Sequence, residues 1–149
     1  MKFVSILHYV EMSYGGKPSF VILMSDGKEY ISNGCVFVEN NQENIDQLIQ
    51  KYSCKSFLDE LFDSPPLPIE ELVDGRSMFR GCKSLTEFNI DLPNLVNGQG
   101  MFFCCKSLTD FNSDLPNLVD GSYMFCGCDS LTEFNVDLPN LEDDRAMFF

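Results

Sequence analysis

Carboxylate and amide side chains recur at fixed spacing in the second half of the chain. Three segments each carry an acid, an asparagine and an aspartate at alternate positions. The nine residues are Glu87, Asn89, Asp91, Asp110, Asn112, Asp114, Glu133, Asn135 and Asp137. Alternate residues of a strand point to the same side of a sheet, so the pattern predicts one acidic face. Such an array could attract a basic partner, bind calcium or transfer protons.

The sequence around these acids favours attraction of a partner. A calcium site would need a glycine-bearing loop with several ligands in one short segment, and these residues lack it. Proton transfer needs carboxyl groups whose pKa is raised in an enclosed pocket, whereas a repetitive strand face is open. Another reading is that the acids only keep the surface solvated, while stacked asparagine amides hydrogen-bond to one another.

No other set of residues indicates catalysis, a metal or a cofactor. The chain has one histidine, His8, and no nucleophile elbow or phosphate-binding glycine loop. It has seven cysteines, an odd number. Two pairs, Cys104 with Cys105 and Cys126 with Cys128, lack the spacing of a structural zinc site. We therefore expect no enzyme activity, no cofactor, no metal site and reduced thiols.

The acidic segments belong to a repeat of 23 residues. LVDGRSMFRGCKSLTEFNIDLPN (72–94) is followed by two similar copies at 95–117 and 118–140, and a fourth copy begins at 141. A fixed period predicts a solenoid, in which each unit buries its apolar side against its neighbours. Within each unit, a run such as Leu85-x-x-Phe88-x-Ile90 predicts one short strand on the concave face. The strand should end at Leu-Pro, because proline cannot donate to a neighbouring strand.

These residues resemble a known repeat family. The pattern MF-x-x-C-x-SLT-x-F-x-x-x-LPNL is similar to the BspA-like leucine-rich repeats, best known from bacterial surface proteins and some parasitic protists. The resemblance covers residues 72–149. It implies a leucine-rich-repeat solenoid of about three and a half coils, with a function in adhesion or protein binding.

The first half of the chain has a different pattern. Apolar runs separated by turn signals, among them Asp26-Gly27 and Asn33-Gly34, predict an antiparallel meander. The expected strands are 2–12, 19–25, 28–32 and 35–38. Residues 41–52 predict an amphipathic helix. Residues 54–71 allow two readings, a degenerate first repeat with an insertion or a short helix at 56–62.

The expected fold is therefore α+β, a short solenoid of 23-residue repeats with an N-terminal meander and helix as its cap. The expected division places an α+β capping element at 1–71 and leucine-rich repeats at 72–149. Because the chain ends before a fourth strand, strand 130–136 should form an uncovered sheet edge. Such an edge can recruit another strand, which makes a homodimer one expectation.

The net charge and the hydropathy of the chain indicate which partners and which location to expect. Ten basic residues against 23 acidic ones give a net charge of −13, spread over both halves. Direct nucleic-acid binding requires a cationic footprint, so it is not expected. No apolar stretch approaches the roughly 18 residues that span a bilayer. His8 and Glu11 interrupt the N-terminal apolar run, which favours a strand over a secretory signal. The expected location is cytoplasmic; the alternative is a secreted or surface protein whose signal peptide was removed.

These observations predict a non-catalytic module that binds a basic protein through its acidic concave face. The sharper hypothesis is an inhibitor that imitates nucleic acid and docks on a nucleic-acid-binding protein. In size and charge, though in no motif, the chain resembles phage-encoded inhibitors of host defence such as anti-CRISPR proteins. The alternative, implied by the BspA-like repeats, is a bacterial surface module for adhesion or host interaction.

Overall fold

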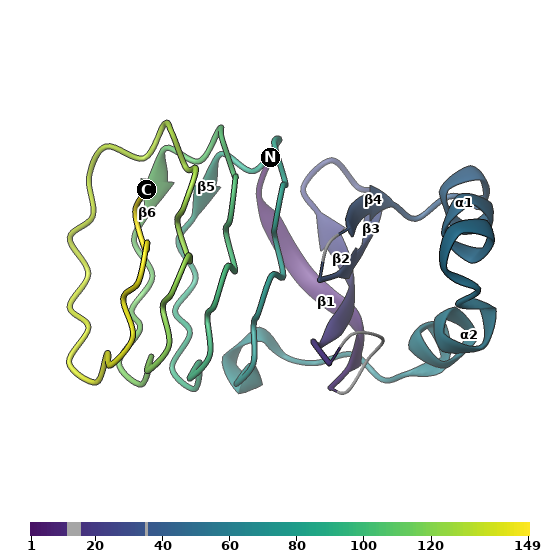
Figure 1. Cartoon of the computed structure of the whole chain (residues 1–149), viewed down its shortest axis with the longest axis horizontal. Coiled ribbons are helices and arrows are strands. Elements are labelled where there is room, and N and C mark those ends of the chain that lie inside the picture. The colour runs from purple at the N-terminus through teal and green to yellow at the C-terminus, as the bar shows by residue number, and fades with distance from the viewer. Residues whose placement is uncertain (12–15, 35) are drawn as a thin grey trace.

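An antiparallel sheet lies in the middle of the molecule, with two helices on one side and the repeated segments on the other (Figure 1). The computed structural model describes residues 1–11, 16–34 and 36–149. In these ranges the elements are β1 (Phe3–Val10), β2 (Ser19–Met24), β3 (Glu29–Asn33), β4 (Val36–Glu39), α1 (Gln42–Tyr52), α2 (Lys55–Asp63), the 3₁₀ turn η1 (Ile69–Glu71), β5 (Glu87–Phe88) and β6 (Asp110–Phe111).

The first four strands form a meander in which each strand is antiparallel to the one before it. Tight turns at glycines set this order, because glycine adopts a left-handed backbone without steric cost. Gly27, after β2, has φ +80°, and Gly34, after β3, has φ +59°. The Asp26 carboxylate also accepts the N–H of Lys28 at 2.9 Å, which holds the first of these turns. Part of the expected fourth strand, residue 35, lies outside the described residues.

Two helices follow the meander. The side chain of Asn41 caps α1 by accepting the N–H of Asn44 at 2.9 Å. The helix ends at Ser53, whose φ of +52° is left-handed. Residues 55–63 form α2, so the helix reading of the segment 54–71 is confirmed and the degenerate repeat is wrong. Leu58 and Leu61 of α2 are buried where the helix contacts β1 and β2.

The sheet contributes to two separate apolar clusters. Val21 and Ile31 face the helices and pack with the buried residues of α2. Phe20, Ile22 and Met24 face the other way and continue into the core of the repeats. This alternation follows from the period of two in a strand, so one sheet separates the helices from the repeats.

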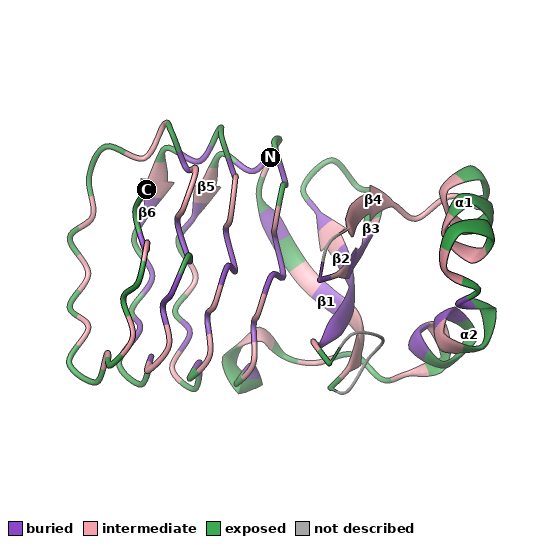
Figure 2. Cartoon of the chain, in the orientation of Figure 1, coloured by how far each residue is buried: buried purple, intermediate pink, exposed green. Residues whose placement is uncertain are grey.

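The apolar interior of the repeats is built on phenylalanine. Phe79, Phe102, Phe125 and Phe148 stack in one column, with centroids 5.4 Å, 5.4 Å and 5.6 Å apart. A second column, which includes Phe88, meets the first edge to face. Both arrangements are favourable for aromatic rings. We call residues 72–149 the repeat stack. Its apolar positions form a continuous buried interior as far as Cys128, beyond which most are only partly buried (Figure 2).

Backbone hydrogen bonds join successive copies mainly along one side of the repeat stack. The N–H groups of Gly75, Ser77 and Phe79 donate to carbonyls of the next copy at 2.8–3.0 Å, and the later copies repeat these bonds. Isolated parallel bridges such as Asp74 with Asn97 mark the same side. A Cβ on Gly98 would lie 3.1 Å from Met124 Sδ, so the close packing here accounts for a glycine.

The predicted leucine-rich-repeat solenoid of about three and a half coils, with one strand per copy, is wrong. The regular elements are a four-stranded antiparallel sheet and two helices. In the described ranges the repeats contribute only β5 and β6, of two residues each, and the expected strand at 131–136 is absent. The physical reason is the location of the hydrogen bonds: they run along 73–82 and its equivalents rather than along the expected strands.

The first residues of the chain cover the beginning of the repeat stack. Lys2 forms a parallel bridge with Glu87, and the N–H of Thr86 donates to the carbonyl of Met1 at 3.0 Å. Inside, the ring of Phe3 lies edge-on to Phe79, with centroids 5.7 Å apart. The N-terminal segment thus supplies both backbone and side-chain partners to the first copy.

Candidate functional site

The nine residues of the predicted acidic face lie in three rows on one side of the repeat stack. Glu87 is paired with Asp110 across β5 and β6, so the first two rows are in parallel register. The third row has no strand, but the ring of Phe134 stacks on that of Phe111 with centroids 5.9 Å apart. Backbone pairing therefore aligns two rows, and the ring contact places the third beside them.

We call the first residues of the three rows the inner file; they are Glu87, Asp110 and Glu133. Lys2 neutralises one of them, because its Nζ lies 2.9 Å from Glu87 Oε1. Asn89 Nδ2 donates to Glu87 at 3.2 Å and to Asp110 at 3.5 Å. Asn112 Nδ2 donates to Asp110 at 2.6 Å. The asparagine amides thus bond to the carboxylates and bridge their negative charges.

The outer file, Asp91, Asp114 and Asp137, is exposed throughout. One oxygen of Asp91 accepts the backbone N–H of Asp114 at 2.9 Å. In the described part of the chain, none of the ion pairs involves a member of the outer file. These carboxylates therefore provide negative charge that a partner can reach without breaking an ion pair.

The spacing of the rows sets the charge density of the face. Neighbouring strands lie about 4.8 Å apart, and each row carries two carboxylates. The face thus presents about one carboxylate per 2.4 Å along the stack, and Lys2 neutralises one of the six, Glu87. Duplex DNA carries about one negative charge per 1.7 Å of its axis. The two densities are similar, although the protein sustains its own over three rows only.

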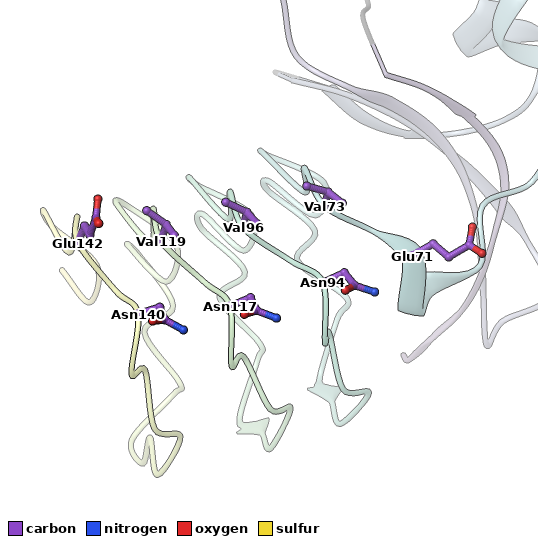
Figure 3. A pocket seen from close by; sticks show the side chains of 8 residues that line it. All are labelled: Glu71, Val73, Asn94, Val96, Asn117, Val119, Asn140 and Glu142. Carbon is purple, nitrogen blue, oxygen red and sulfur yellow. The ribbon is translucent and has the colours of Figure 1, made fainter.

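A second surface, which the sequence analysis missed, is a shallow groove of 790 Å³ on another side of the repeat stack (Figure 3). Its lining residues are Glu71, Val73, Asn94, Val96, Asn117, Val119, Asn140 and Glu142. Val73 and Val96 are exposed by 52% and 39%. The signal for this groove was present in the sequence, because the valines and asparagines recur with the 23-residue period.

The asparagines of this groove have structural partners. Asn94, Asn117 and Asn140 each donate from Nδ2 to a backbone carbonyl of the preceding segment, at 2.7, 2.6 and 2.8 Å. The bonds of Asn117 and Asn140 tie one copy to the one before it, and the bond of Asn94 ties the first copy to η1. The amides therefore serve to align the copies, which leaves the valines as the exposed apolar component of the groove.

A further set of acids stabilises the turns. Asp74 and Asp143 each accept the N–H two residues ahead, at 3.1 Å, and bind the guanidinium of Arg76 and Arg145, respectively, at 2.8 Å. The hydrogen bond from Arg145 lowers the pKa of Asp143 below its usual value. These carboxylates are already paired, unlike the outer file of the acidic face.

Three cysteines of the repeat stack, Cys82, Cys105 and Cys128, are buried thiols. The Sγ atoms of Cys105 and Cys128 donate to the carbonyls of Phe79 and Phe102 at 3.1 and 3.0 Å. Burial raises the pKa of Cys128 to about 12 and that of Cys82 to about 11. All six described cysteines are free. The neutral thiol is therefore favoured, whereas metal binding and nucleophilic attack require the thiolate.

Over the described ranges, no three His, Cys, Asp or Glu residues are grouped so that they could hold a metal ion. Nor is any described helix long and apolar enough to cross a membrane. No family model, curated protein or solved structure matches the chain. The similarity to BspA-like repeats stays a prediction, and the functional argument rests on the geometry alone.

Proposed function

We propose that this chain is a non-catalytic binding protein whose acidic face docks on a basic protein. The observation that carries the proposal is the arrangement of six carboxylates in three rows with Lys2 as the cation paired to them. Complementary charge of this kind accelerates association and selects partners. In this function, the buried residues of the 23-residue repeats form the scaffold, and the exposed residues of the acidic face recognise the partner.

The partner we propose is a protein whose own ligand is nucleic acid. The support is the charge density of the face, about one carboxylate per 2.4 Å, which is close to that of a nucleic-acid backbone. A binding cleft lined with lysine and arginine would accept the carboxylates in place of phosphates. The bound chain would then exclude nucleic acid, so its effect would be inhibition.

Non-catalytic binding fits the surroundings of the acids better than acid–base chemistry. Asp91, Asp114 and Asp137 are exposed, and exposed carboxylates are well solvated. A general acid needs a carboxyl group that stays protonated near neutral pH, which burial or a nearby like charge provides. We also propose an intracellular location, supported by the free thiols among the described residues of the repeat stack.

Charge reversal of the outer file tests the acidic face. The variant combines Asp91→Lys, Asp114→Lys and Asp137→Lys. Its matched control combines Asp46→Lys, Glu60→Lys and Asp63→Lys, which are exposed positions on α1 and α2 and give the same net charge.

Both variants and the unmodified chain are immobilised, exposed to cell lysate at low salt, and washed with short duplex DNA or single-stranded RNA. We expect basic nucleic-acid-binding proteins on the unmodified chain and on the control, released by the nucleic acid, and at least a tenfold loss on the charge-reversed face. Equal capture by both variants would show that binding follows net charge and would contradict docking through this face.

We also propose that a second copy of the chain covers the apolar end of the repeat stack. Phe148 and Phe149 are exposed by 54% and 85%, and Phe134 and Leu138 are only partly buried. A dimer would remove these groups from water. The expected strand edge at 130–136 is not formed, so the contact would use side chains. A mass by light scattering that stays monomeric up to high protein concentration would contradict it.

A further inference from the structure

The two helices lie on the opposite side of the sheet from the repeat stack (Figure 1). Residues of the sheet and of both helices line a second cavity. Its volume is 240 Å³. The lining is mainly apolar, from β3, β4, α1 and α2, and includes Ile31, Val36, Leu48, Tyr52, Phe57 and Leu58. None of these residues belongs to the acidic face, so the cavity is independent of the function proposed above.

The helix α1 leaves this space unfilled. Its apolar residues Ile45, Leu48, Ile49 and Tyr52 lie against the cluster on the sheet but are only partly buried, and no residue of α1 is fully buried. The 240 Å³ space is a pocket that opens to solvent, since Leu48, Tyr52 and Phe57 in its lining are only partly buried. An apolar cavity of about 150 Å³ accommodates benzene, whereas drug-sized ligands occupy about 300 Å³ or more.

One end of the cavity is polar. Asn33 lines it, and Ser19 lies opposite Asn33 in the pairing of β2 with β3. Ser19 shares a strand face with Val21, which packs toward the helices. Its hydroxyl is fully buried and has no hydrogen-bond partner within the described ranges. Ser19 does not line the cavity, however, so the side-chain amide of Asn33 is the hydrogen-bonding group that we assign to a ligand at this end.

The charged group in the described lining is the Lys17 ammonium, which already has a partner. Lys17 lies at the same end, but its Nζ donates to Ser77 Oγ in the repeat stack at 3.3 Å. Its alkyl chain crosses the turn, where Cδ would contact a Cβ on Gly34 at 3.4 Å. The protein's net charge of −13 also disfavours an anion. A neutral molecule fits this environment best.

We infer that this cavity binds a small neutral alcohol with an apolar body of roughly eight to twelve carbon atoms, a size set by the comparison with known cavities. The body would fill the space beneath α1. The hydroxyl both donates and accepts, so it would complement the side-chain amide of Asn33, which also donates and accepts. The ligand would also order α1 against the sheet.

The test measures binding of 1-octanol to the full chain by ligand-observed NMR and calorimetry. Octanoate, with the same chain length and a negative charge, is the control ligand. Leu48→Trp places a large ring in the cavity from α1, and Val36→Phe narrows it from β4. Val4→Trp is the matched control, because Val4 is 51% exposed on β1. Circular dichroism confirms that each variant is folded.

We expect saturable 1:1 binding of 1-octanol, retained in Val4→Trp and weakened at least tenfold in both cavity variants. Octanoate should bind at least tenfold more weakly than 1-octanol. Absence of saturable binding of 1-octanol would overturn the inference. So would equal binding of the two ligands, or retention of binding in a folded cavity variant. If Leu48→Trp does not fold, Val36→Phe decides the outcome.

Discussion

The repeat stack and the helix pair bury their apolar side chains to different extents. In the stack, Phe79 and Phe102 are 0% exposed and each stacks on the equivalent ring of the next copy. On the other side of the sheet, α1 buries no residue fully and borders a cavity. In a repeated sequence the same side chains pack against each other at every junction between copies, because each copy contacts only similar neighbours. The helices occur once, and their packing leaves room for a ligand.

The largest expected effect is on the free energy of unfolding, when truncation of a ring in the repeat stack is compared with truncation of a side chain on α1. Phe102→Ala should destabilise the protein by about 3–5 kcal/mol, because it removes a fully buried ring with partners on both sides. Ile45→Ala on α1 should cost about 1 kcal/mol, since Ile45 is only partly buried. Urea unfolding followed by circular dichroism measures both. Similar losses would show that the helix pair is packed as tightly as the stack.

Alkaline pH should weaken the repeat stack through its buried thiols. Burial raises the pKa of Cys82 to about 11 and that of Cys128 to about 12, from an ordinary value of 9.0. Above pH 9 the thiols ionise in the unfolded chain while they stay neutral in the folded one. Stability is therefore complete below pH 9 and is lost as the pH rises toward 11–12. The loss is about 1.4 kcal/mol per pH unit for each thiol.

The free energy of unfolding, measured by urea titration from pH 8 to pH 10, checks this dependence. The variant Cys82→Ala with Cys128→Ala should show a flatter profile than the unmodified chain. Tyr30 also has a raised pKa, caused by burial and then by its bond to Asp26, and it is present in both proteins. The Cys105 thiol, whose pKa burial also raises, is likewise present in both. Identical profiles would therefore exclude Cys82 and Cys128 as the cause of the pH dependence.

The smallest expected effect concerns repulsion on the acidic face. Replacing Asp91, Asp114 and Asp137 by asparagine keeps an acceptor for the Asp114 N–H and removes three like charges. We expect a gain in stability of a few tenths of a kcal/mol at low salt, which should vanish at about 1 M salt because the charges are exposed. Thermal unfolding at two salt concentrations measures it. A loss of stability at low salt would mean that the carboxylates support the stack.

Local signals in the first half of the chain predicted its elements closely. The turn dipeptides at 26–27 and 33–34 identified the hairpins, and the helix expected at 41–52 is α1, Gln42–Tyr52. Turn chemistry and helix periodicity act over a few residues, so they can be read without a structure. The incomplete burial of α1 against the sheet was not predictable from local signals, because it depends on the distance between the helix and the sheet in the folded protein.

The period of the repeats was evident, but their backbone was not predictable from it. Phe88, Phe111 and Phe134 occupy equivalent positions, yet a strand forms at the first two only. Short parallel pairing is weak, and the copies are joined instead through 73–82 and its equivalents. The nine residues of the acidic face were placed by periodicity, whereas the bonds from Asn89 and Asn112 to the acids required the side-chain geometry.

Because equivalent apolar residues recur in each copy, the number of copies in the repeat stack could change without a change in its core positions. Deleting residues 95–117 would join Asn94 to Leu118, which recreates the Asn-Leu junction already present between copies. The same phenylalanine and methionine positions would meet across the new junction. A copy could be lost or gained while the phenylalanine columns stay matched, although contacts particular to one copy, such as Arg80 with the Phe103 ring, would be lost. Each change would add or remove one row of carboxylates. The length of the acidic face is therefore proportional to the number of 23-residue copies in the chain.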